Sequence, residues 1–132
     1  MRLLVTGNRG YIGTVMVPML QKEGFDVVGL DNDLFEGCIF GDESICGSSQ
    51  KILYFKKDIR NVELSDLQGV DAVVHLCALS NDPLGYFNPE VTYEINYKAA
   101  VRLAKLAKKV GIQRYLYTSS CSVYGASGTD VV

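Results

Sequence analysis

Short apolar runs alternate along the chain with longer segments in which apolar residues recur every three or four positions. The apolar runs are nearly continuous, which is typical of parallel strands that are covered on both faces. We expect strands over Leu3–Val5, Phe25–Leu30, Ile52–Lys56, Asp71–Ala78 and Arg114–Thr118. Strands that alternate with helices predict an α/β fold with a doubly wound, mostly parallel sheet in the order 3-2-1-4-5.

Two segments carry apolar residues at helical spacing. The first is Tyr11–Lys22, and Gly24 stands where a glycine commonly follows a helix. The second is Pro89–Val110, with Asn88 placed to cap its first turn and Gly111 placed to end it. These two segments are the long helices that we expect to cover the sheet.

The remaining connections have weaker patterns. We expect a short helix over Val62–Leu67 with Asn61 as its N-cap. The segments Leu34–Lys51 and Leu79–Asn88 contain glycine, serine, proline and asparagine without helical or strand periodicity, and they predict loops.

The first apolar run leads directly into three glycines with two residues between successive glycines: Gly7, Gly10 and Gly13. Gly7 is expected to permit a tight turn, Gly10 to let backbone amides approach a pyrophosphate, and Gly13 to let the helix pack on the strand. Because the glycines follow a strand and open a helix, they predict a dinucleotide site. The alternative is an ordinary strand-to-helix turn that binds nothing.

A carboxylate follows the second apolar run, since Asp31 lies 18 residues after Gly13. At the tip of a second strand, a carboxylate accepts hydrogen bonds from the hydroxyls of an adenosine ribose and repels a 2′-phosphate. The pattern therefore favours NAD over NADP as the cofactor. The alternative is an acidic side chain that serves only a turn or a cap.

Composition narrows the function classes. The 132 residues are 48% hydrophobic and 21% charged, as expected of one domain spanning 1–132, and the net charge of −2 provides no basic surface for nucleic acid. Neither a signal peptide nor an apolar run of membrane-spanning length is visible, so we expect a cytoplasmic protein.

The cysteines and the single histidine show no metal-binding pattern. Cys38, Cys46, Cys77 and Cys121 form no C-x-x-C pair and have no ligand spacing with His75, so no metal site is expected. His75 lies within an apolar run and is expected to be a hydrogen-bonded core residue rather than a catalyst.

Taken together, the motifs resemble those of the extended short-chain dehydrogenase/reductase family, in particular its NAD-dependent nucleotide-sugar epimerases and dehydratases of the UDP-glucose 4-epimerase type. The residues that carry the resemblance are Thr6-Gly7-x-x-Gly10-x-x-Gly13, Asp31-Asn32, Asp58-Ile59, His75-Leu76-Cys77-Ala78, Asn96, and Thr118-Ser119-Ser120 before Val123-Tyr124-Gly125. The resemblance implies a Rossmann fold that is truncated after about five strands.

The resemblance also implies roles for individual residues. It places them at the pyrophosphate (Tyr11 and Ile12 with the three glycines), at the ribose (Asp31, Asn32), beside the adenine (Asp58, Ile59), and along the path to the nicotinamide (Leu76, Cys77, Ala78). Thr118 and Asn96 belong to the same cofactor-binding set, and Ser120 matches the catalytic hydroxyl that hydrogen-bonds the reacting sugar oxygen. From its place on an apolar stripe, Asn96 needs a partner, either a neighbouring backbone or an active-site loop that it orients.

One element of the family chemistry is missing. None of the eight tyrosines has a lysine four residues later, so the Tyr-x-x-x-Lys pair, in which the lysine lowers the tyrosine pKa, is absent. The resemblance therefore implies the N-terminal, NAD-binding part of a larger enzyme that acts on a nucleotide sugar. We expect this part to bind NAD without turnover. The alternatives are a non-catalytic NAD-sensing module that acts through a protein partner, and a remnant that serves only assembly.

The last predicted strand would leave an open sheet edge, because no covering helix is predicted after it. Open edges are commonly paired or covered. We therefore expect this edge, or the long second helix, to be buried by self-association in a homodimer or a larger oligomer.

Overall fold

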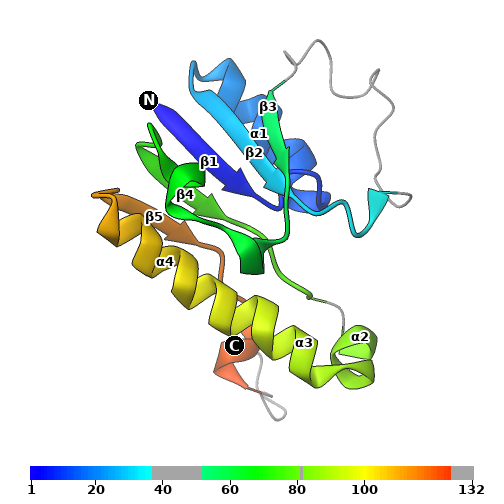
Figure 1. Cartoon of the computed structure of the whole chain (residues 1–132). Helices are drawn as coiled ribbons and strands as arrows, with labels where there is room; N and C mark the ends of the chain where they lie inside the picture. The colour runs from blue at the N-terminus through cyan, green and yellow to red at the C-terminus, as the bar shows by residue number, and fades with distance from the viewer. Residues whose placement is uncertain (37–51, 81, 126–132) are drawn as a thin grey trace.

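A computed structural model describes residues 1–36, 52–80 and 82–125 (Figure 1). Its centre is a five-stranded sheet in the order β3-β2-β1-β4-β5, with every pair of neighbours parallel. The strands are β1 (Arg2–Thr6), β2 (Asp26–Asp31), β3 (Leu53–Lys56), β4 (Ala72–His75) and β5 (Arg114–Tyr117). The predicted fold class and strand order are confirmed.

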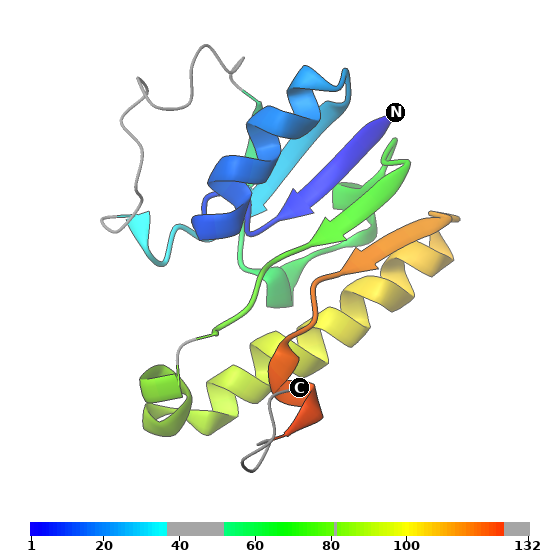
Figure 2. The ribbon, with the colours of Figure 1, turned by 180° about the vertical axis from the view of Figure 1, so that it is seen from behind.

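Helices lie on both faces of the sheet. α1 (Tyr11–Lys22) covers β1 and β2 on one face, and the long helix made of α3 (Pro89–Tyr93), η4 (Glu94–Ala99) and α4 (Ala100–Lys109) covers the other (Figures 1 and 2). Asn88 Oδ1 accepts a hydrogen bond from Val91 N at 3.2 Å, which confirms the predicted N-cap. Gly111, with φ of +85°, follows the end of the helix as predicted.

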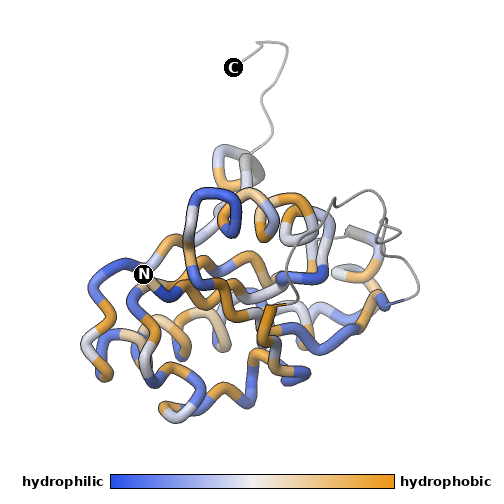
Figure 3. The backbone as a smooth tube through the Cα atoms, turned by 90° about the horizontal axis from the view of Figure 1, so that it is seen from above, coloured by the Kyte–Doolittle hydropathy of each residue, from blue (hydrophilic) through white to orange (hydrophobic). Residues whose placement is uncertain are grey.

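The core has two layers because successive side chains of a strand point to opposite faces. Leu4 packs with Val28 and Val73 beneath the long helix, whereas Val5 packs with Val74 beneath α1. Figure 3 colours the chain by the hydropathy of each residue, and hydrophobic residues follow one another along segments in the middle of the molecule. Among the described residues, no helix combines the length and the apolar content that crossing a bilayer requires.

Two local predictions are wrong. The segment predicted as the loop Leu79–Asn88 contains the helix α2 (Asp82–Phe87), whose Pro83 falls in the first turn, where proline is tolerated. The segment predicted as a helix over Val62–Leu67 contains only the 3₁₀ turn η3 (Leu64–Leu67), and a separate 3₁₀ turn, η2 (Ile59–Asn61), precedes it.

Asn61 is therefore not an N-cap but the last residue of η2. Asp58 caps η2 by accepting a hydrogen bond from Arg60 N at 2.9 Å, so the turn begins before Asn61. The Asp66 carboxylate accepts the Glu63 N–H at 2.8 Å and starts η3 separately. Most of the predicted loop Leu34–Lys51 lies outside the described residues, as do Cys38 and Cys46.

Candidate functional site

The predicted site residues gather where the parallel strands end. Gly7 follows β1, Asp31 ends β2, Asp58 follows β3, Leu76 follows β4 and Thr118 follows β5. The chain order reverses between β1 and β4, which are neighbours in the sheet. In open α/β sheets this reversal, at the carboxyl ends of the strands, is where ligands bind.

The three glycines of the first turn have different environments. Gly7 has φ of +72°, and a Cβ there would lie 2.9 Å from Cys77 N. A Cβ on Gly13 would lie 2.4 Å from Gly7 O, so this glycine lets the helix pack against the turn itself. A Cβ on Gly10 would meet only Gly7 O, at 3.4 Å. Gly10 is therefore the position where the backbone is open to a ligand.

The N-terminus of α1 is also open. Gly10 is its N-cap, and no side chain of the described residues caps the helix. The first amides of any helix have no acceptor within the helix, and the helix dipole favours an anion there. Tyr11 and Ile12, the first two residues of the helix, are 84% and 52% exposed. A pyrophosphate therefore fits at this end of α1.

Asp31 is fixed to the glycine turn by its own side chain. Arg9 N donates to Asp31 Oδ2 at 3.0 Å, and Asp33 N donates to Oδ1 at 2.9 Å. Each carboxylate oxygen can accept a second hydrogen bond, so both can still take a ribose hydroxyl. Asn32 lies beside it, exposed, with its Oδ1 accepting the Leu34 N–H at 3.1 Å.

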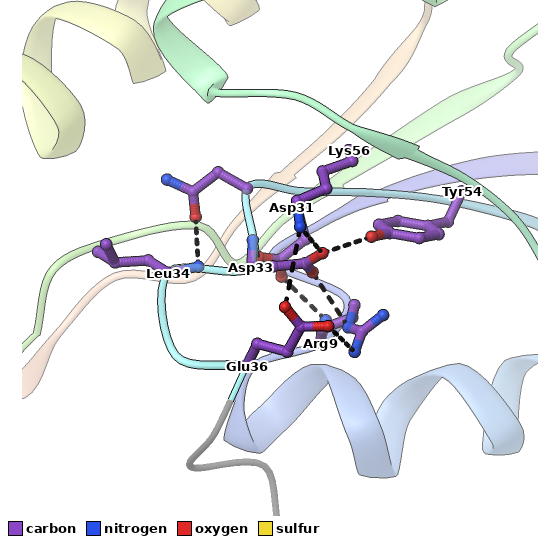
Figure 4. A network of polar contacts seen from close by, with 8 residues as sticks. Arg9, Asp31, Asp33, Leu34, Glu36, Tyr54 and Lys56 are labelled. Carbon is purple, nitrogen blue, oxygen red and sulfur yellow. Dashed lines mark hydrogen bonds and ion pairs between the residues drawn. The ribbon is translucent and has the colours of Figure 1, made fainter.

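A charged cluster next to Asp31 was not predicted (Figure 4). The Asp33 side chain, 2% exposed, pairs with Arg9 Nε at 3.1 Å and with Lys56 Nζ at 3.0 Å. Tyr54 donates its hydroxyl to Asp33 Oδ2 at 2.6 Å. The only sequence signal for this cluster is the second carboxylate in Asp31-Asn32-Asp33, since Arg9, Tyr54 and Lys56 lie far from it in the chain.

The titration of the cluster follows from these contacts. Burial alone would raise the pKa of Asp33, but the hydrogen bonds from Tyr54 and Lys56 and the charge of Arg9 outweigh it and lower that pKa. The hydrogen bond to Asp33 raises the pKa of Tyr54 and that of Lys56. Asp33 therefore stays ionised and Lys56 stays charged.

The two residues expected beside the adenine, Asp58 and Ile59, come after β3 in the chain and differ in what they expose. The Asp58 carboxylate accepts Arg60 Nη2 at 2.7 Å, and this pairing lowers its pKa. The Ile59 side chain is 3% exposed and belongs to the core beneath the long helix. Its side chain therefore does not face the site, and only its backbone can lie beside a ligand.

The segment after β4 is held on two sides. Cys77 N donates to Thr6 Oγ1 at 3.4 Å, and burial raises the pKa of the Cys77 thiol to about 12, which favours the protonated thiol. Asn96 Oδ1 accepts the Leu79 N–H, and Asn96 Nδ2 donates to Leu79 O, both at 2.8 Å. Asn96 therefore binds a neighbouring backbone, one of the two partners expected for it, and positions the segment that contains Ala78.

His75 and the residues after β5 complete this edge. His75 is 1% exposed, and its Nδ1 lies 2.7 Å from Thr6 Oγ1, which confirms the predicted core histidine. Burial lowers its pKa to about 4. Thr118 Oγ1 donates to His75 O at 2.9 Å and extends the pairing of β4 with β5. Ser120, exposed, follows at the start of η5 (Cys121–Tyr124).

Comparison with known proteins decides the family. Residues 3–131 match the sequence model of the NAD dependent epimerase/dehydratase family. The chain belongs to this family. The cofactor of the family is NAD, so the glycine turn and Asp31 are the residues at which NAD binding should be tested.

Three similar proteins illustrate the match. A UDP-glucose 4-epimerase of Mycolicibacterium smegmatis is 36% identical over 129 residues, which are 95% of this chain and 41% of that protein. A UDP-glucose 4-epimerase of Klebsiella pneumoniae is 28% identical, over 95% of this chain and 93% of that protein. The crystal structure of a UDP-glucose 4-epimerase from Stenotrophomonas maltophila, with bound NAD and formylated UDP-arabinopyranose, has a TM-score of 0.83 at 28% identity, over 99% of this chain and 40% of that one.

The chain therefore spans about two fifths of the length of the Mycolicibacterium and Stenotrophomonas proteins. The part that it shares with them contains the sheet, the glycine turn and Asp31.

Proposed function

We propose that this chain binds NAD, with the glycine turn on the pyrophosphate and Asp31 on the adenosine ribose. The observation that carries the proposal is the hydrogen bond from Arg9 N to Asp31 Oδ2 at 3.0 Å. It ties the ribose acceptor to the backbone of the phosphate-binding turn, so the two subsites keep a fixed separation. Family membership and the likeness to a NAD-bound epimerase support the same function.

The chain's own residues would divide the work of holding NAD. The open backbone at Gly10 and the first amides of α1 would receive the pyrophosphate oxygens. Asp31 would accept the ribose hydroxyls, with Asn32 beside it. Leu76, Cys77 and Ala78 would line the path toward the nicotinamide, because they follow β4 next to Gly7.

We further propose that the complete enzyme is a nucleotide-sugar epimerase or dehydratase. In such enzymes bound NAD accepts a hydride from a sugar carbon and can return it. In this chain the hydroxyl of Ser120 would hydrogen-bond the reacting sugar oxygen. The chain holds no Tyr-x-x-x-Lys pair, so it lacks the base that this chemistry uses, and we expect no turnover from these residues alone.

Calorimetric titration of the 132-residue chain with NAD tests the binding site. Asp31→Asn removes the carboxylate that accepts the ribose hydroxyls and should raise the Kd for NAD about tenfold or more. Asp26→Asn is the matched control, because Asp26 is the first residue of the same strand and lies at the opposite end from Asp31. An unmodified chain that does not bind NAD, or equal effects of the two variants, would overturn the proposal.

Incubation with NAD and UDP-, dTDP- or GDP-linked sugars tests the second part. We expect no product from the chain alone, measured by chromatography of the sugar nucleotides. Sustained product formation would show that this chain carries a base that its tyrosine spacing does not reveal.

A further inference from the structure

Two cations lie beside the carboxylate proposed to bind the ribose. Arg9 belongs to the glycine turn, and its backbone N–H donates to Asp31. Lys56 lies on β3 directly opposite Asp31 of β2. An arginine near this position is the feature that accommodates the 2′-phosphate of NADP. The site therefore contains cationic side chains of the kind that would accept NADP, next to a carboxylate that favours NAD.

Asp33 holds both cations. Its Oδ1 pairs with Arg9 Nε at 3.1 Å, and its Oδ2 pairs with Lys56 Nζ at 3.0 Å (Figure 4). The Arg9 guanidinium also lies over the Tyr54 ring, 5.4 Å from its centre, and Tyr54 donates its hydroxyl to Asp33. The Arg9 side chain is thus held by an ion pair and by an aromatic face.

The backbone of Asp33 is adapted to this contact. Asp33 is the only described non-glycine residue with positive φ, at +59°. This left-handed conformation is uncommon outside glycine, although aspartate and asparagine tolerate it better than most residues. It accompanies a side chain that is 2% exposed and aimed between the two cations.

The balance of charge in the cluster opposes a phosphate. The cluster contains three carboxylates: the two cations pair with Asp33 and Glu36, and Asp31 accepts the backbone N–H of Arg9. A 2′-phosphate would add up to two negative charges to a cluster that already carries one in excess. It would also have to take Arg9 and Lys56 away from a buried carboxylate, which would then be left unpaired.

We propose that Asp33 is a positioning residue that sets cofactor specificity: it holds Arg9 and Lys56 away from the ribose 2′ position, and so excludes NADP. This inference rests on the proposed binding of NAD. Asp31 would select NAD over NADP by contacting the ribose. Asp33 would be a second carboxylate with the same effect, acting through the two cations without touching the cofactor.

Asp33→Asn tests the proposal, because asparagine keeps the size of the side chain and tolerates the left-handed backbone. Calorimetric Kd values for NAD and NADP should show that the preference for NAD falls about tenfold or more, mainly through tighter NADP binding. The variant should also gain affinity for adenosine 2′,5′-bisphosphate relative to 5′-AMP, because these two ligands differ by the 2′-phosphate. This change in preference should become smaller as the salt concentration is raised from about 0.05 to 0.5 M.

Glu36→Gln is the matched control. It removes the same charge from the same two cations, but Glu36 is 61% exposed and its contacts are at 3.8 Å, so the preference should change less than about threefold. If the unmodified chain binds NAD but Asp33→Asn has the same preference for NAD over NADP, the role of Asp33 is overturned and the proposed function is not. If the unmodified chain binds neither NAD nor NADP, the proposed function itself is overturned.

Discussion

Gly10 and Gly13 lie in the same turn, but the structure predicts different consequences for replacing them. Gly13→Ala would place a Cβ 2.4 Å from Gly7 O and 2.6 Å from Asn8 C, both backbone atoms that cannot move without opening the turn. We expect it to lower the free energy of unfolding by about 3 kcal/mol or more.

Gly10→Ala is the contrasting variant. Gly10 has φ of −77°, which alanine adopts freely, and its Cβ would meet only Gly7 O at 3.4 Å. We expect a loss of less than about 1 kcal/mol in urea unfolding but about tenfold weaker NAD binding, because the new Cβ stands where the pyrophosphate approaches. Equal effects of the two variants on stability would contradict this division of roles.

His75 predicts a dependence of stability on pH. Burial lowers its pKa to about 4 from the ordinary value of 6.5, so between these values the unfolded chain binds the proton more strongly than the folded one. The free energy of unfolding should therefore fall as the pH is lowered through this window, by about 1.4 kcal/mol per pH unit and roughly 3 kcal/mol in total.

Urea unfolding at several pH values measures this slope, and His75→Asn is the test variant. Asparagine can place a polar atom near Thr6 Oγ1, where His75 Nδ1 lies at 2.7 Å, but it does not titrate. The pKa values of Asp33 and Asp58 are lowered from the ordinary carboxyl pKa of 3.8. Their effect on the free energy of unfolding therefore changes with pH below 3.8, outside the window in which His75 acts. A variant that keeps the full slope would show that another group causes it.

At the scale of elements, the long helix does more than cover the sheet. Its middle part, η4 (Glu94–Ala99), is a π-helix, and this widened turn carries Asn96. Asn96 makes two 2.8 Å hydrogen bonds to the backbone of Leu79, so the helix fixes the segment that leaves β4. That segment contains the residues expected along the nicotinamide path.

Asn96→Ala should therefore loosen the segment after β4. Both backbone groups of Leu79 would lose their partner, and we expect a loss of about 1–3 kcal/mol in the free energy of unfolding. Hydrogen exchange at the Leu79 amide should accelerate more than exchange within α4. Asn88→Ala, which removes the cap of the same helix, should cost about 1 kcal/mol without this local effect at Leu79.

The sequence predicted the elements that depend on local pattern and missed those that depend on distant partners. The strands, their order and the span of α1 follow from apolar periodicity and from the glycines that bound the helix. α2 was missed because Pro83 and Gly85 are typical of loops, and the two 3₁₀ turns because side-chain caps at Asp58 and Asp66 divide the segment.

The candidate site divides in the same way. Gly7 and Asp31 are recognisable because each stands at a fixed distance along one βαβ unit. The pairing of Asp33 with Arg9 and Lys56 is not, because it joins three separate segments through side chains alone. The burial of Ile59 likewise depends on the packing of η2 against the long helix, and the residues next to Ile59 in the sequence do not indicate this contact.

At the scale of the whole molecule, the β5 edge makes self-association testable. β5 is the last strand in the sheet order, and its Leu116 and Tyr117 are 55% and 54% exposed. Among the described residues no strand pairs with the outer side of β5, and an edge of this kind that exposes apolar residues favours pairing with a second copy. We therefore propose that the chain forms a homodimer or a larger oligomer through this edge.

Sedimentation velocity between about 1 and 100 μM should show an average mass that rises with concentration, as mass action requires. Leu116→Lys adds a charge to the edge and should shift the distribution toward the monomer. Val15→Lys makes the same kind of change on α1, where Val15 is 61% exposed, and should leave it unchanged. A monomer at every concentration would contradict self-association, and an effect of Val15→Lys alone would assign the contact to α1 instead of β5.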